Sequence, residues 1–398
     1  MTEKPLSGVK VLELGQLMAG PFAGTLLAYF GADVIKVEPP GRGDAVRGWR
    51  AMTGDTSLWW YSLGRNKRSV TVNLKSDEGR RIIRRLAGEV DVLIENFRPG
   101  TLENWGLGPD DLQAINPGLI IARVSGYGQD GPYSSRPGYA SVCEGVGGLR
   151  YVNGFPGQPP VRQNLSLGDS LTGLHTAFGI LLSLFHRNQQ TVKTGQVVDV
   201  GIYEAVYNMM EAVVPEYDRM GMIREPSGTT ITGVVPTNTY PCRDDKYVII
   251  GGNGDSIFKR LMTAAGRPDM ADDPELVDNA GRLNHQERVD GAISDWTRTL
   301  TAAEVLEVLE MARVPAGLIY SVVDMVNDPH FQARGLFEVV EAGGEPLTLP
   351  AIIPKLSKTP GKTEWAGPTV GEHTRQVLGE VLGLSDDELD TLSEEGVI

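Results

Sequence analysis

Short apolar runs that alternate with helix-length segments most constrain the fold of this chain. Residues 9–14 and 34–37 read as strands, and residues 21–30 between them read as a helix that begins near a proline. Such a strand–helix–strand unit is the start of a nucleotide-binding type of sheet. Further strand-like runs occupy residues 70–74, 91–95, 119–124 and 196–201. The sequence therefore predicts an α/β fold with ligands at the carboxyl ends of its strands.

The turn after the first strand, residues 15–20, does not carry the glycine fingerprint of dinucleotide-binding proteins. It reads Gly-Gln-Leu-Met-Ala-Gly instead of GxGxxG, so Glu38 at the end of the second strand supports a nicotinamide site only weakly. Residues 361–363 read Gly-Lys-Thr like the end of a P-loop, but Leu356 stands where the first glycine belongs. Neither nicotinamide nor ATP chemistry is therefore expected.

The sequence also lacks the residue patterns that other common enzyme chemistries require. None of the five histidines stands at a metal-ligand spacing, no GxSxG elbow occurs, and Cys143 and Cys242 form neither a cluster nor a disulfide framework. The net charge of −14 argues against nucleic-acid binding, although residues 1–100 carry 15 basic and 11 acidic side chains. Apolar stretches fall short of a membrane span, and we see no signal peptide. We expect a cytoplasmic enzyme without metal, nucleic-acid or membrane partners.

Asp169 stands at the start of a strong helical pattern. Apolar side chains recur at helix spacing from Leu171 to Phe185, which gives that segment one apolar face. Asp169 falls where an N-cap belongs, so it either caps this helix only or serves as a catalytic carboxylate that the helix N-terminus keeps ionised. A carboxylate is charged at neutral pH and can act as a nucleophile without a base. The local sequence leaves both interpretations open.

Three polar side chains follow predicted strands. Lys75 comes after one strand, and Asn96 and Arg98 come after the next, so all three lie where a sheet of this type binds a phosphate. Loop capping and surface charge explain the same residues equally well. The pair Gly251 and Gly252 also follows a strand-like run, and it either places backbone N–H groups over a ligand or forms a tight turn.

The chain resembles a known family through short motifs that occur in order along nearly its whole length. They are Leu6–Glu13, Ala19–Pro21, Gly31–Pro40, Asn66–Ser69, Glu95–Gly100, Ser125–Tyr133, Gly168-Asp169, Thr194–Val200 and Gly371–Thr374. Each motif alone is weak, but together they are similar to class III CoA-transferases, the family of formyl-CoA:oxalate and carnitine CoA-transferases.

The resemblance implies a Rossmann-like large domain built from both chain ends, a smaller central α+β domain and a homodimer of interlocked rings. In this chain the large CoA-binding domain would comprise residues 1–214 and 330–398, and the small domain residues 236–329. Residues 215–235, rich in Pro, Gly and Thr, would be the linker.

The resemblance also implies an activity and a nucleophile. The carboxylate that matches Asp169 attacks the donor thioester, and the reaction passes through a mixed anhydride and an aspartyl-CoA thioester before CoA reaches the acceptor acid. Gln16 would support the developing oxyanion, and Gly251 and Gly252 match a family loop that covers the site. CoA is then a substrate and not a permanently bound cofactor, and no ATP is needed.

The family's CoA contacts fall on one set of positions in this chain: Met18, Ala19, Val72, Lys75, Asn96, Phe97, Arg98, Tyr139 and, near them, Arg136. Two positions depart from the pattern. Asn104 stands where the family commonly has an arginine that is expected to contact a phosphate, and Pro39 stands where one relative has an arginine that contacts CoA. Arg42 or Arg47 could compensate by meeting a phosphate.

Two alternatives stay open. A 2-methylacyl-CoA racemase of the same fold needs a His/Asp pair where this chain has Tyr139 and Ala140, and a catalytically silent CoA-binding protein would use Asp169 only as a cap.

A loose likeness of residues 237–254 to relatives that use succinyl-CoA favours succinyl-CoA as the donor and a dicarboxylate as the acceptor. We therefore expect a CoA-transferase that acts on small organic acids.

Overall fold

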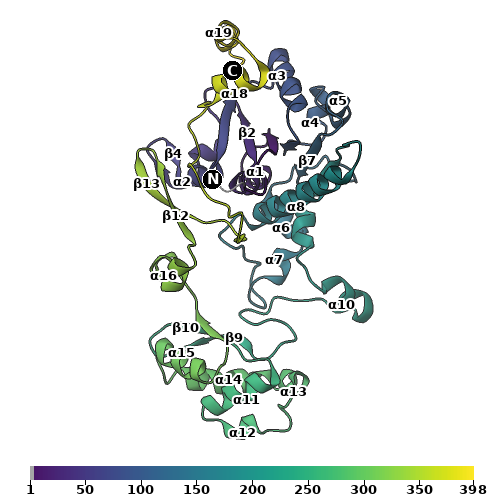
Figure 1. The fold of residues 1–398 in the computed structure, drawn as a ribbon. Coiled ribbons are helices and arrows are strands. Elements are labelled where there is room, and N and C mark those ends of the chain that lie inside the picture. Colours follow the sequence, from purple (N-terminus) through teal and green to yellow (C-terminus); the bar gives the residue numbers. More distant parts are fainter. Residues whose placement is uncertain (1–3) are drawn as a thin grey trace. The chain divides into compact units, whose positions relative to one another are not determined.

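The computed structural model describes residues 4–398, which form two compact units. The larger unit comprises residues 4–149, Gln163–Glu211 and Gln332–Ile398, so segments from both ends of the chain belong to it (Figure 1). The smaller unit comprises Arg150–Arg162 and Ala212–Phe331. The assignment of these units as a CoA-binding domain and a small domain stays a prediction, as does the interlocked dimer.

A six-stranded sheet forms the centre of the larger unit. Its strands are β1 (Lys10–Glu13), β2 (Asp33–Glu38), β5 (Lys67–Thr71), β6 (Val92–Glu95), β7 (Ile120–Ser125) and β8 (Val197–Gly201). They run in the order β5-β2-β1-β6-β7-β8, and every neighbouring pair is parallel. The predicted α/β fold is therefore confirmed. The strand order reverses between β1 and β6, which is where sheets of this type bind ligands.

The other elements of the larger unit are mostly helices. They are α1 (Ala19–Tyr29), α2 (Leu58–Leu63), α3 (Asp77–Gly88), α4 (Thr101–Asn104), α5 (Pro109–Ile115), α6 (Ala140–Val146), α8 (Leu167–Gln189), α9 (Ile202–Tyr207), α18 (Thr374–Leu382) and α19 (Asp386–Glu394). Short elements complete the unit: the 3₁₀ helix η1 (Ala45–Gly48) and the hairpins β3 (Met52–Thr53) with β4 (Thr56–Ser57), and β12 (Phe337–Ala342) with β13 (Glu345–Pro350).

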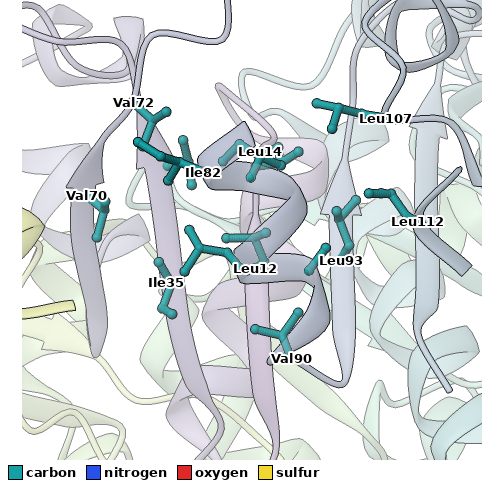
Figure 2. Close-up of a cluster of buried hydrophobic side chains, with 14 of the residues drawn as sticks. Leu12, Leu14, Ile35, Val70, Val72, Ile82, Val90, Leu93, Leu107 and Leu112 are labelled. Carbon is teal, nitrogen blue, oxygen red and sulfur yellow. The ribbon is translucent and has the colours of Figure 1, made fainter. Parts of the chain in front are cut away.

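Both faces of the sheet carry an apolar core because successive side chains of a strand point to opposite sides. Leu12 and Ile35 belong to a core with α3, α5, α18 and α19, and Figure 2 shows them in one cluster with Ile82 of α3. Val11 and Val34, each the neighbour of one of these residues, belong to a second core with α1 and α8. The C-terminal helices α18 and α19 therefore complete a core that the first strands begin.

The smaller unit has a three-stranded antiparallel sheet in the order β11-β10-β9. Its elements are α10 (Val213–Met220), β9 (Thr237–Pro241), β10 (Tyr247–Gly251), α11 (Asp255–Ala264), α12 (Pro268–Ala271), α13 (Asn279–Asn284), α14 (Gln286–Thr297), α15 (Ala302–Met311), β11 (Ala316–Leu318) and α16 (Val322–Asn327). Two short helices, α7 (Leu149–Val152) and α17 (Pro329–Ala333), cross the boundaries between the units.

The segment predicted as a linker, residues 215–235, begins inside a helix. α10 occupies Val213–Met220 and places Pro215 in its first turn. A proline is tolerated there because the first N–H groups of a helix have no intrahelical acceptor. None of the helices within residues 4–398 is both long and apolar enough to cross a membrane.

Candidate active site

Gln16 and Asn96 join the ends of the two strands between which the strand order reverses. The backbone N–H of Gln16 donates to the Asn96 Oδ1 over 2.8 Å, and the Asn96 Nδ2 donates to the Gln16 carbonyl oxygen over 2.6 Å. Gly15 lies against the same amide, because a side chain there would begin 3.0 Å from the Asn96 Oδ1. These contacts fix the turn after β1 at the place where the strand pattern predicts a ligand.

Leu17 continues this turn in a left-handed conformation, with a φ of 65° that is unfavourable for a residue with a side chain. Its backbone N–H donates to both carboxylate oxygens of Asp44, over 3.1 and 3.0 Å. Asp44 is buried and pairs with the Lys36 Nζ over 2.8 Å. Burial alone would raise the pKa of Asp44, but Lys36 outweighs it, and the pKa lies below its ordinary value. A buried ion pair therefore holds the turn in place.

Asp169 lies in the first turn of α8. The helix begins at Leu167 with Ser166 as its N-cap, so the prediction that Asp169 is itself the N-cap is wrong. The apolar pattern starts only at Leu171, so it does not reveal the extra turn that the Ser170 N–H closes by donating to the Ser166 carbonyl. As the third helical residue, Asp169 still lies near the positive end of the helix dipole, which favours its ionised form. Its side chain is half-buried.

Two contacts fix the start of α8. The backbone N–H of Gly168 donates over 3.1 Å to the Oε1 of Glu144, a buried residue of α6. Gly173 allows α8 to approach α1 closely, because a side chain at this position would begin 2.8 Å from the Phe22 ring and 3.0 Å from the Ala19 carbonyl oxygen. The first turns of α8 therefore lie beside the start of α1.

Two adjoining cavities at this end of the sheet contain every predicted site residue of the larger unit. The first, of about 330 Å³, is lined by Gln16, Met18, Ala19, Asn96, Phe97, Arg98, Arg136, Tyr139 and Asp169, among others. The second, of about 440 Å³, is lined by Val72 and Lys75 together with Pro39, Arg42 and Trp105. Gln16 and Phe97 line both cavities, so the two meet at the turn after β1. Below they are called the Asp169 cavity and the Lys75 cavity.

Gly251 and Gly252 belong to the smaller unit, where Gly251 ends β10. The Gly252 N–H donates to the Pro236 carbonyl over 2.9 Å, and a side chain at Gly252 would begin 2.6 Å from Leu261. This is the close packing that a tight strand-to-helix turn requires. Their role as a loop over the site stays a prediction.

Only one of the two arginines that could compensate for the missing family contacts faces a cavity. Arg47 is buried, and its guanidinium donates to both carboxylate oxygens of Glu38 over 2.7 Å. Arg42 is exposed and lines the Lys75 cavity, whereas Asn104 lines neither cavity. Across residues 4–398, no carboxylate forms an ion pair with Arg42, Lys75 or Arg98. These three cations are therefore available to an anion.

The sequence interpretation missed a buried charge cluster beside the site. Glu95 ends β6 next to Asn96, and the Nε of Arg123 donates to its carboxylate over 2.8 Å. Burial raises the pKa of Glu95 to about 7, although Arg123 acts in the opposite direction. Glu13 and Glu38 are likewise buried at the ends of their strands. An acidic residue that directly ends an apolar run is the signal that could have revealed all three.

Comparison with known proteins agrees with this geometry. Residues 6–374 match the model of CoA-transferase family III. The chain belongs to CoA-transferase family III. Within residues 4–398, no group of three or more His, Cys, Asp or Glu side chains is placed to hold a metal ion.

Relatives of this family III member cover its whole length. A protein of Chloroflexus aurantiacus named succinyl-CoA–D-citramalate CoA-transferase is 46% identical over 397 residues, 99% of this chain and 98% of the relative. The beta subunit of succinyl-CoA–L-malate CoA-transferase from the same organism is 43% identical over 403 residues, 100% of this chain and 99% of the relative. A crystal structure of a CaiB/BaiF family protein from Brucella suis superposes with a TM-score of 0.84 at 31% identity and covers 95% of this chain and 100% of that one. The family III chain is thus a CoA-transferase, an enzyme whose substrates are CoA thioesters.

Proposed function

We propose that this CoA-transferase moves CoA from succinyl-CoA, or a similar acyl-CoA, to a small dicarboxylic acid, with Asp169 as the nucleophile. One observation carries the proposal: Asp169 and the predicted CoA contacts line two adjoining cavities at the carboxyl ends of the sheet. The relatives named for citramalate and malate support a succinyl-CoA donor and a dicarboxylate acceptor. The working form in this proposal is a cytoplasmic homodimer of interlocked rings.

In the first half of the reaction, a carboxylate oxygen of Asp169 attacks the carbonyl carbon of the donor thioester. The carbon–sulfur bond breaks, CoA leaves as a thiolate, and the donor acyl group becomes a mixed anhydride with Asp169. The thiolate sulfur then attacks the Asp169 carbonyl carbon of the anhydride. The donor acid leaves as its carboxylate, and an aspartyl-CoA thioester remains.

In the second half, the acceptor carboxylate attacks the carbonyl carbon of the aspartyl-CoA thioester and expels the CoA thiolate again. The thiolate attacks the acceptor carbonyl carbon of the new anhydride, which releases the acceptor's CoA thioester and restores the Asp169 carboxylate. One thioester and one carboxylate enter, and one of each leaves. The cycle therefore needs no net proton transfer, no ATP and no general base.

Gln16 has a defined task in this scheme. Its backbone N–H is already bonded to Asn96, so the side-chain amide is the group that donates to the oxyanion as it develops next to Asp169. Donors that are fixed before the reaction stabilise such charge without reorganising. The hydrogen bonds between Asn96 and the Gln16 backbone fix the turn from which this side chain extends.

CoA would extend along both cavities with its thioester end at Asp169. Lys75 and Arg42 in the Lys75 cavity and Arg98 in the Asp169 cavity would meet the phosphates as charge-assisted pairs. Phe97 and Trp105 pack edge to face, with ring centroids 5.3 Å apart, and line the Lys75 cavity with aromatic surface that suits an adenine ring.

The test is a transfer assay with succinyl-CoA and a panel of dicarboxylic acids, read by mass spectrometry of the CoA products. We expect transfer by the natural protein and none by Asp169→Ala, with Asp110→Ala as the control because Asp110 is an exposed first-turn carboxylate of α5. Hydroxylamine added with acyl-CoA should leave a hydroxamate on Asp169. Substantial transfer by Asp169→Ala would remove Asp169 from the role of nucleophile.

The racemase alternative has less support. It needs an acid–base pair at the α-carbon, and none of the described residues that line the Asp169 cavity is a histidine. Deuterium wash-in at the α-carbon of a 2-methylacyl-CoA, without CoA transfer, would favour it instead.

A further inference from the structure

Arg50 occupies an unusual position between η1 and β3. Its backbone φ is 64°, a left-handed value that is uncommon for a residue with a long side chain. The guanidinium lies over the Trp59 ring, with its carbon 3.8 Å from the ring centroid. One guanidinium nitrogen, Nη2, donates to the Ser166 Oγ over 3.1 Å. Stacking and hydrogen bonding thus hold an exposed arginine in one orientation.

Both contacts of Arg50 lead to the proposed reaction centre. Ser166 is the N-cap of α8, and Asp169 is the third residue of that helix. The N-cap side chain and the third side chain of a helix lie together over its first turn. Trp59 belongs to an apolar cluster that includes Met18, and Met18 lines the Asp169 cavity. The hydrogen bond to Ser166 therefore places the Arg50 charge next to the first turn of α8, and Trp59 packs against the same cluster as Met18 of the Asp169 cavity.

The charge of Arg50 lies over the Trp59 ring but is not neutralised within the described chain. Between residues 4 and 398 no carboxylate forms an ion pair with it, whereas Arg47 pairs with Glu38 and Arg123 pairs with Glu95. A guanidinium presents several N–H donors in a planar fork, and Ser166 engages only one nitrogen. The remaining donors match a carboxylate, the group that a fixed arginine fork binds best.

We propose that Arg50 binds the second, non-reacting carboxylate of a dicarboxylic acid whose other carboxyl group reacts at Asp169. This inference rests on the proposed function and adds a specificity residue to it. The donor acid and the acceptor acid occupy the place beside Asp169 in turn, so the same contact can serve the free carboxylate of succinyl-CoA and that of the acceptor. Substrates with a single carboxylate leave Arg50 without a partner.

The test compares substrates that differ only in the second carboxylate, in the natural protein, Arg50→Met and Arg50→Lys. Succinate and butyrate serve as acceptors in one arm, and succinyl-CoA and butyryl-CoA serve as donors in the other. We expect Arg50→Met to lower kcat/KM for the dicarboxylic substrates about 10- to 100-fold, as expected when a charged hydrogen-bond partner is lost, and to leave the monocarboxylic ones nearly unchanged. Arg50→Lys should recover part of the loss.

The control is Arg81→Met, which removes an exposed charge from α3 and should change neither substrate pair. If Arg50→Met lowers kcat/KM only for the dicarboxylic acceptor or only for the dicarboxylic donor, Arg50 contacts that substrate, and the proposal is supported. An equal loss for mono- and dicarboxylic substrates, or no loss for either, means that Arg50 only packs on Trp59, and it overturns the proposal.

Calorimetry measures the direct binding of succinate to the natural protein and to Arg50→Met. This measurement tests the role of Arg50 independently of the proposed function. If the natural protein transfers no CoA, the proposed function fails. Weaker succinate binding by Arg50→Met would still support the carboxylate site in that case, and equal binding by the two proteins would refute it.

Discussion

The Asn96 side chain accepts a hydrogen bond from the Gln16 N–H and donates one to the Gln16 carbonyl, so one amide satisfies both backbone groups of its neighbour. An amide can do this because it has an acceptor and a donor on the same planar group. The pair links the segments that follow β1 and β6, and it positions the residue that the proposed mechanism uses at the oxyanion.

Asn96→Asp tests this pair. The variant keeps the acceptor for the Gln16 N–H but turns a carboxylate oxygen towards the Gln16 carbonyl. We expect the free energy of unfolding to fall by about 1–3 kcal/mol and the KM for acyl-CoA to rise. Denaturant titration and steady-state kinetics measure the two effects. Asn284→Asp, at an exposed position of α13, is the control, and equal stability of the two variants would contradict the assigned role.

Substitutions of Arg42 and Arg47 should have different effects, the first on the binding of acyl-CoA and the second on the stability of the fold. Arg42→Gln should raise the KM for acyl-CoA about tenfold, because an exposed cation of the Lys75 cavity is lost, with little change in unfolding. Arg47→Gln leaves Glu38 without its main partner and should lower the free energy of unfolding by about 3–5 kcal/mol. Repeating the Arg42→Gln kinetics with dephospho-CoA thioesters shows which phosphate is bound: the defect disappears if it is the 3′-phosphate. An unchanged KM for every thioester would exclude Arg42 from the CoA site.

Glu95 predicts a pH dependence of stability. Burial raises its pKa in the folded protein from 4.5 to about 7, so the folded state binds this proton more tightly than the unfolded chain does. The resulting stability is fully present below pH 4.5 and is lost as the pH rises through 7. Glu95→Gln should therefore flatten the decline in the free energy of unfolding across that window, measured by denaturant titrations at successive pH values.

Glu103 is a useful comparison because its pKa is shifted in the opposite direction from that of Glu95. Its hydrogen bond with Arg123 holds its pKa below the ordinary value of 4.5, so its contribution is present above that pH and is lost on acidification. Because the Glu103 charge also raises the pKa of Glu95, Glu103→Gln should reduce the slope between pH 4.5 and 7 without abolishing it. If Glu95→Gln leaves that slope unchanged, Glu95 is not the group that titrates there.

The approach of α8 to α1 at Gly173 gives a fourth prediction. Gly173→Ala places a methyl group within 3.0 Å of Phe22 and should destabilise the protein by about 1–3 kcal/mol and slow CoA transfer, because the first turns of α8 must shift. Gly145→Ala in α6 meets no atom within 4 Å and should be neutral or stabilising by up to about 1 kcal/mol. Thermal unfolding and transfer kinetics of both variants test this prediction. A fully active and stable Gly173→Ala protein would show that neither stability nor CoA transfer depends on the close approach of α8 to α1.

The apolar strands were predictable because burial on both faces of a parallel sheet leaves continuous apolar runs. The predicted strand at 70–74 corresponds to β5, but β5 spans Lys67–Thr71, so it both starts and ends three residues earlier than predicted. Its first residues read as a polar loop because a sequence does not show that the Lys67 Nζ is buried against Glu13 at 2.8 Å. The charged residues at the start of β5 thus concealed its first boundary.

The candidate site was predictable only in part. Residues that follow strands could be placed at one end of the sheet by topology alone, and the structure brings Lys75, Asn96 and Arg98 to that end. Asp44 and Glu144 act on the site by binding backbone N–H groups that are distant in the sequence, of Leu17 and Gly168. No local pattern marks such contacts, so only the folded arrangement reveals them.

The Lys75 cavity includes Gly396 in its lining, and the neighbouring Val397 carbonyl accepts a hydrogen bond of 2.8 Å from the Asn73 N–H. Val397 also packs in the core that Leu12 helps to form. The same short segment therefore forms part of the wall of the cavity and part of the core. A substitution that loosens it would alter the shape of the cavity and the packing around Leu12 together.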